Sequence, residues 1–115
     1  SQRFADIEWN PLRKLMPIQG YANEPLVTLE KAVEPLLELV HDVKNQAAWA
    51  KWKCEDLSSA ELSLDQAAAI VLYSMEWHPQ DKCLYYVLNA TLRNEDRQKL
   101  KPWFRYLKLF LTGLS

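Results

Sequence analysis

The end of the chain, from Trp103 to Leu114, carries apolar side chains on nearly every side of a predicted helix. A helix of this kind has to be enclosed by other elements. Either the preceding helices wrap it, or it binds a partner outside this chain. The six residues that we single out as a candidate interface are Trp103, Phe104, Leu107, Phe110, Leu111 and Leu114.

Composition favours a helical domain. The 115 residues are enough for one domain or a piece of one. Hydrophobic residues make up 49% of the chain, five of them tryptophans, which argues against disorder. Only two residues are glycine, and Ala, Leu, Lys and Glu are frequent, as is typical of helices.

Charge and hydropathy give no reason to expect nucleic acid or a membrane as partner. The formal net charge is −1, so long-range attraction to a polyanion is weak. No apolar run approaches the roughly 20 residues that span a bilayer. Two cysteines, Cys54 and Cys83, are too few for a disulfide framework. We therefore expect a cytoplasmic protein with reduced thiols.

The spacing of apolar residues predicts an all-α fold of about six helices in a compact orthogonal or irregular bundle. Residues 1–27, punctuated by three prolines, are expected to form an extended but ordered arm. Residues 28–115 are expected to form the helical domain. Its predicted helices cover residues 29–40, 42–54, 64–77, 81–93, 95–101 and 102–112.

Several helix boundaries have recognisable signals. Thr28 and Asp42 are suitable N-caps, and Ser63 with Gln66 has the spacing of a capping box. Pro35 lies in the second turn of its helix, which it should kink or delay. Pro102 suits the first position of the final helix.

No catalytic, cofactor-binding or metal site is expected in this chain. His41, His78 and the two cysteines lack the close spacing of zinc ligands. No Cys/His arrangement indicates an activated nucleophile. With Gly20 and Gly113 as the only glycines, a phosphate-binding glycine-rich loop is excluded.

Two hypotheses about binding surfaces remain open, and each has a simpler structural interpretation. A run of cations interleaved with aromatic residues could bind nucleic acid, although a solvated charged face is the more common arrangement. Its members are Arg93, Arg97, Lys99, Lys101, Arg105 and Lys108. Four tryptophans could form a binding platform, although aromatic residues at helical spacing more often lie in a core. These are Trp49, Trp52, Trp77 and Trp103.

Three segments together resemble the mono-ADP-ribosyltransferase family. They are Ser63–Trp77 with Tyr73, Leu84–Arg93 with Asn89, and Leu100–Leu111. The similarity is to the helical region that precedes the catalytic core in the arginine-specific, NAD-dependent transferases. Similar lead-in segments at 17–21 and 25–36 extend the resemblance over most of the chain.

The resemblance implies a supporting role. In that family an α/β core binds NAD through an Arg on its first strand, a Ser-containing strand and a Glu-x-Glu loop. The last two features do not occur here, so no catalytic residue is carried over. The chain is therefore expected to be an inactive helical region, with NAD as the cofactor of the parent enzyme. Its partner would be a catalytic α/β lobe of the same protein or of another. Without that lobe, the helical region is expected to expose an apolar patch or to cover it by forming a homodimer. The alternative is a stand-alone helical module that binds a protein partner.

Overall fold

Residues 20–56 and 62–114 are described by the computed structural model, and within these ranges the fold is all-α, as predicted. The described residues contain five α-helices, where six helices were predicted, and no strand. The helices are α3 (Leu29–Val33), α4 (Val43–Lys53), α5 (Leu64–Ser74), α6 (Leu84–Arg93) and α7 (Phe104–Leu114). Short 3-10 segments connect them: η1 (Gly20–Asn23), η2 (Glu34–Leu36), η3 (Gln80–Lys82) and η4 (Arg97–Trp103).

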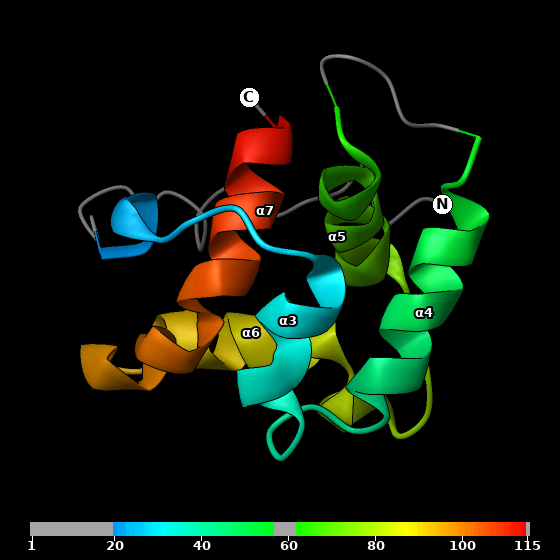
Figure 1. Cartoon of the computed structure of the whole chain (residues 1–115). Helices are drawn as coiled ribbons and strands as arrows, with labels where there is room; N and C mark the ends of the chain where they lie inside the picture. Colours follow the sequence, from blue (N-terminus) through cyan, green and yellow to red (C-terminus); the bar gives the residue numbers. More distant parts are fainter. Residues whose placement is uncertain (1–19, 57–61, 115) are drawn as a thin grey trace.

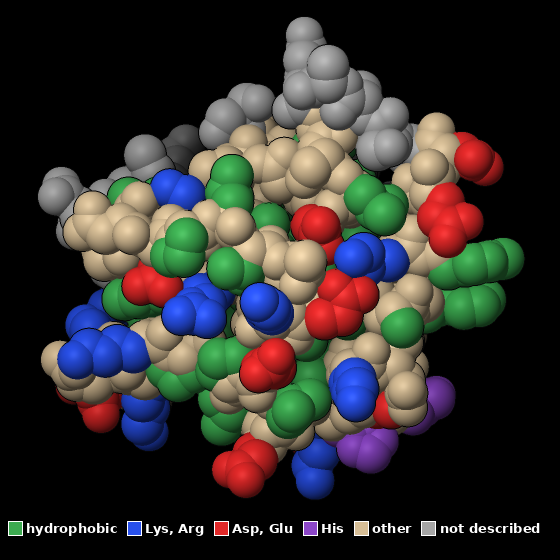
Figure 2. Space-filling model, in the orientation of Figure 1, with side chains coloured by type: hydrophobic (Ala, Val, Ile, Leu, Met, Phe, Trp, Pro, Cys, Tyr) green, Lys and Arg blue, Asp and Glu red, His purple; other side chains and the backbone are tan. Residues whose placement is uncertain are grey.

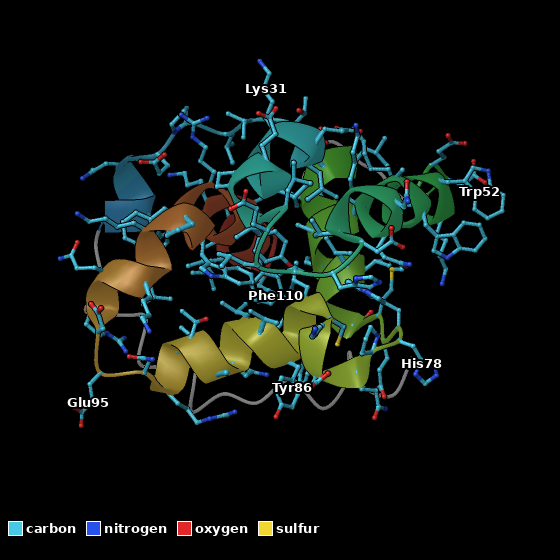
Figure 3. All side chains as sticks on the ribbon, turned by 90° about the horizontal axis from the view of Figure 1, so that it is seen from below. Lys31, Trp52, His78, Tyr86, Glu95 and Phe110 are labelled. Carbon is cyan, nitrogen blue, oxygen red and sulfur yellow. The ribbon has the colours of Figure 1, made fainter. Side chains whose placement is uncertain are left out.

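Helix α5 occupies the middle of the bundle. Helices α4 and α7 lie on either side of it, and the short α3 packs against all three (Figure 1). Helix α6 runs across the back of this layer (Figures 1 and 3). The largest fully buried side chains form one continuous core between the helices: Trp103, Tyr73, Tyr106, Phe110, Leu29, Leu36, Leu72, Leu84, Leu88, Leu92 and Leu100.

Two of the predicted caps are confirmed. The hydroxyl of Thr28 accepts a hydrogen bond from the backbone N–H of Lys31 at the start of α3. At the start of α5, the hydroxyl of Ser63 accepts from the N–H of Gln66 at 3.1 Å. The side chain of Gln66 in turn accepts from the N–H of Ser63 at 3.0 Å. Both predicted caps therefore form within the first turn of their helix, as the sequence pattern predicts.

The predicted helix 29–40 is shorter than expected. Its α-helical part ends at Val33, and Glu34–Leu36 form η2 with Pro35 near its first position. Proline has no N–H to donate and its ring clashes with the carbonyl four residues earlier. The predicted kink at Pro35 is thus a change of helix type.

Asp42 precedes α4 as predicted, but its side chain does not cap the backbone. Its φ of 57° places it in the left-handed region, which Asp tolerates better than most residues. The carboxylate instead accepts hydrogen bonds from the side chains of Asn45 at 2.8 Å and Gln46 at 3.1 Å. The first turn of α4 is therefore held by these side-chain contacts together with the backbone hydrogen bond that the Gln46 N–H donates to the Asp42 carbonyl oxygen at 3.1 Å.

The remaining helix boundaries shift. Helix α5 ends at Ser74, three residues before the predicted end, and Met75 has an extended backbone. This extension lets Trp77 Nε1 donate to the carbonyl oxygen of His41 at 2.7 Å. The predicted helix 95–101 is the 3-10 segment η4, and Pro102 lies inside it. Helix α7 accordingly begins at Phe104, two residues later than predicted.

The apolar final helix is enclosed by this chain itself. Trp103, Leu107 and Phe110 of the candidate interface are fully buried, because α5 and α3 pack on α7 and η1 covers part of its outer side. These three residues belong to the core and cannot contact a partner without opening it. Phe104, Leu111 and Leu114 are partly exposed and remain candidate interface residues. Of the predicted arm, residues 1–19 lie outside the described residues.

Candidate functional site

The motif residues Tyr73 and Asn89 meet between α5 and α6. The Tyr73 hydroxyl donates to Asn89 Oδ1 at 3.4 Å, a long and therefore weak hydrogen bond. Asn89 is only 3% exposed, and a buried amide needs partners to offset its lost hydration. The pair thus joins two of the three segments that carry the family resemblance.

A series of aromatic contacts extends from this pair into the third segment. The ring centroid of Tyr73 lies 5.0 Å from that of Tyr85 and 4.8 Å from that of Phe110. Phe110 stacks on Tyr106 at 5.9 Å, and Tyr106 meets the edge of Trp103 at 6.3 Å. Such pairs add to the stabilisation from burial alone. Helices α5, α6 and α7 are therefore packed as one unit.

The hydroxyl of Tyr106 is the polar centre of this unit. It donates to the carbonyl oxygen of Ala69 in α5 at 2.6 Å. Burial, and to a smaller extent the neighbouring Tyr73, raise the pKa of Tyr106 well above its usual value. The phenol therefore stays protonated in the folded protein at pH values where it ionises in the unfolded chain.

Alkaline conditions are expected to destabilise the protein through Tyr106. The contribution of Tyr106 to the free energy of unfolding is constant below about pH 10, the pKa of tyrosine in the unfolded chain. As pH rises from there towards the higher pKa of Tyr106 in the folded protein, this contribution falls by about 1.4 kcal/mol per pH unit. Urea unfolding at pH 8 to 11 measures this slope. Tyr106→Phe should make the decline shallower, whereas Tyr86→Phe on the surface should not. An unchanged slope in Tyr106→Phe would contradict the assignment.

A second polar cluster connects α3, α4 and α5. Asp65 Oδ1 accepts from the backbone N–H of Leu29 at 2.8 Å and lies 3.0 Å from Lys51 Nζ. Lys51 also contacts Glu30 Oε1 at 3.0 Å. Partial burial lowers the pKa of Lys51, but the hydrogen bonds that Lys51 donates to Asp65 and Glu30, together with the negative charges of these two groups, outweigh this effect and the net shift is upward. The sequence patterns did not indicate this cluster, because each of its contacts joins residues that are 14 or more positions apart.

A surface hollow opens beside Asp65. It is lined by Leu26, Val27, Thr28, Lys31, Ser63, Asp65 and Leu109. Its polar groups largely belong to the helix starts: Thr28 and Ser63 accept capping hydrogen bonds, and Asp65 accepts from Leu29. The lining therefore has a structural role, and it shows no nucleophile with an adjacent base.

The basic run between Arg93 and Lys108 is partly engaged in internal contacts. Arg97 donates to the carbonyl oxygen of Leu92 at 3.0 Å. Arg105 Nε lies 3.3 Å from Glu24 Oε1, and Lys108 donates to the carbonyl oxygen of Ala22 at 2.8 Å. These contacts fix η1 and the end of α6, which favours the structural interpretation of the run.

The four tryptophans do not form one platform. Trp103 is in the core, and Trp77 is half-buried against His41. Trp49 and Trp52 on α4 are 50% and 61% exposed. Their rings stack with centroids 4.9 Å apart and planes inclined by 23°. Trp49 and Trp52 therefore form a stacked pair on the surface, apart from the other two tryptophans.

The histidines and cysteines lie apart from any metal-binding arrangement. No group of three His, Cys, Asp or Glu side chains suited to a metal occurs in residues 20–56 and 62–114. Cys54 and Cys83 are free and buried; burial raises the pKa of the Cys54 thiol, against a smaller opposite effect of Lys53. Within the same ranges, none of the helices has the length and apolar character needed to span a bilayer.

Comparison of the chain with protein-family models, with curated proteins and with solved structures found no match.

Proposed function

We propose that this chain is the non-catalytic helical region of an NAD-dependent, arginine-specific mono-ADP-ribosyltransferase. The observation that carries the proposal is the convergence of the three resembling segments. They supply α5, α6 and most of α7, and the motif residues Tyr73 and Asn89 bond to each other where α5 meets α6. A resemblance spread over three separate segments thus corresponds to one packed unit.

The role of this unit is to brace a catalytic α/β lobe. A core joined by aromatic contacts and by the Tyr106–Ala69 hydrogen bond is a rigid support. The surface offered to the lobe is the partly exposed side of α7, with Phe104, Leu111 and Leu114. Half-exposed apolar residues on a rigid helix suit a partner that is itself an ordered domain.

The lining of the hollow beside Asp65 supports placing NAD outside this chain. Among the described residues, this hollow presents the carboxylate of Asp65 and one cation, Lys31, whereas a pyrophosphate needs converging N–H groups or cations. The N-terminus of α5 is already occupied by its own capping box. The proposal therefore assigns NAD to the catalytic lobe, and no chemical step to this chain.

An NAD titration followed by amide NMR tests the proposal. NAD alone, up to millimolar concentration, is expected to leave the amide shifts of the chain unchanged. A recombinant catalytic lobe of the family should instead shift amides along α7 in a saturable way. Leu114→Ser should weaken this binding, and Leu39→Ser, on an exposed residue away from α7, serves as the matched control. Saturable shifts with NAD alone would contradict a purely supporting role.

A stand-alone interaction module is the second candidate function. The observation that favours it is the exposed, stacked pair of Trp49 and Trp52. Aromatic residues of this size are enriched at protein interfaces. The titration with the catalytic lobe separates the two candidates. If the lobe leaves the amide shifts of α7 unchanged, the supporting role is contradicted and the interaction module remains.

A further inference from the structure

The outward side of α4 carries a row of four side chains that is complementary to a second copy of the same row running in the opposite direction. Lys44, Ala48, Trp52 and Asp56 follow one another at intervals of four residues, and all four are exposed. Residues four apart lie along one stripe of a helix, and Asp56 continues the spacing in the turn that follows α4. The opposite side of the helix faces the core with Val43, Ala47 and Ala50. The row therefore has a charged residue at each end, Lys44 and Asp56, and the small Ala48 and the large Trp52 between them.

We propose that this side of α4 binds the same side of α4 in a second copy of the chain, with the two helices antiparallel. In that arrangement Lys44 of each copy faces Asp56 of the other, and the indole of Trp52 covers the small Ala48 of the other. A two-fold axis makes these contacts reciprocal. If a residue of the first copy contacts a given residue of the second, the same contact also forms with the two copies exchanged.

The stacked tryptophans supply the apolar centre of the contact. Figure 3 shows Trp52 at the rim of the molecule, far from Phe110 in the core. Figure 2 shows acidic and hydrophobic groups side by side over the outer edge of α4. Because Trp49 stacks on Trp52, the pair is already ordered before association. Little side-chain entropy is then lost on binding.

Charge on this side favours a second copy over another kind of partner. Around this side Lys44 and Lys53 are exposed, as are Asp42, Glu55 and Asp56, so cations and anions are mixed. A surface of mixed sign with a net charge near zero gives little long-range attraction for nucleic acid or for a peptide of one sign. The basic residue near the start of α4 and the acidic residues after its end are instead complementary when a second α4 runs in the opposite direction.

The exposed aromatic area sets the strength of the dimer. Each of the two tryptophans exposes roughly half of its about 250 Å², so the four tryptophans of two copies offer roughly 500 Å². Stable interfaces bury about 1,200–2,000 Å² in total. We therefore expect a reversible dimer with a dissociation constant on the order of 100 µM.

Sedimentation equilibrium of the full chain from about 5 to about 500 µM tests the proposal. Trp52→Ala should raise the dissociation constant about tenfold or more. The matched control is Tyr86→Ala, which removes a 51% exposed aromatic ring from α6 and should leave the constant unchanged.

Charge reversal tests the antiparallel register. Lys44→Glu and Asp56→Lys should each weaken the dimer, because each places like charges opposite one another. The double variant should restore the dissociation constant to within about twofold of the original. A monomer at 500 µM, a dimer unaffected by Trp52→Ala, or a double variant that stays as weak as the single ones would each overturn the proposal.

This inference names the partner for the interaction-module candidate and does not rest on the transferase resemblance. Its failure would leave the expected result of the NAD titration unchanged. Conversely, saturable NAD shifts would leave the dimer intact, so the two tests fail independently.

Discussion

Replacing Trp103 with alanine is expected to lower the free energy of unfolding by about 3–5 kcal/mol. The indole is fully buried where η4 joins α7, and it contacts the ring of Tyr106 edge-on. Its removal exchanges a large apolar surface for a cavity that the rigid neighbouring helices fill poorly. Urea unfolding followed by circular dichroism at about 5 µM protein, well below the dissociation constant expected for the proposed dimer, measures the loss.

The same substitution on α4 provides the control. Trp49→Ala and Trp52→Ala remove identical side chains from exposed positions, where replacements usually change stability by about 0.5 kcal/mol or less. Equal losses at buried and exposed tryptophans would contradict the placement of Trp103 in the core.

Asp65→Ala is expected to cost about 1–3 kcal/mol. Leu29 is fully buried and its backbone N–H donates to the Asp65 carboxylate. This N–H is in the first turn of α3, so no carbonyl within the helix can replace the lost acceptor. The substitution also removes one of the two anions beside Lys51. Thermal and urea unfolding measure the effect.

Two further variants separate the hydrogen bond from the ion pair. Glu30→Ala removes only the other, exposed partner of Lys51, and should cost less than about 1 kcal/mol. Asp65→Asn retains an oxygen that can accept from Leu29 while removing the charge, and should be intermediate. If Glu30→Ala is as harmful as Asp65→Ala, the ion pairs rather than the backbone contact hold α3 in place.

The sequence predicts the features that depend on neighbours along the chain. The all-α class follows from apolar periodicity, and the caps at Thr28 and Ser63 follow from side chains that reach backbone groups three residues away. These interactions are complete within a single turn, so no tertiary information is needed to predict them.

Features that depend on distant contacts were not predictable. The early end of α5 reflects the hydrogen bond from Trp77 to His41, 36 positions away. The 3-10 form of η4 and the left-handed conformation of Asp42 likewise have no periodic signal. Apolar spacing also cannot tell a partner within the chain from one outside it, which is why Trp103, Leu107 and Phe110 were wrongly placed in the candidate interface.

The two cationic contacts between α7 and the segment 20–24 have a kinetic consequence. Arg105 and Glu24 are 81 positions apart, and Lys108 and Ala22 are 86 apart. Contacts between such distant positions close long loops, and they become favourable only once the helices between them have docked. Because both contacts are exposed and none of the residues of η1 is fully buried, this segment is the part of the described chain that we expect to close last during folding and to open first under native conditions.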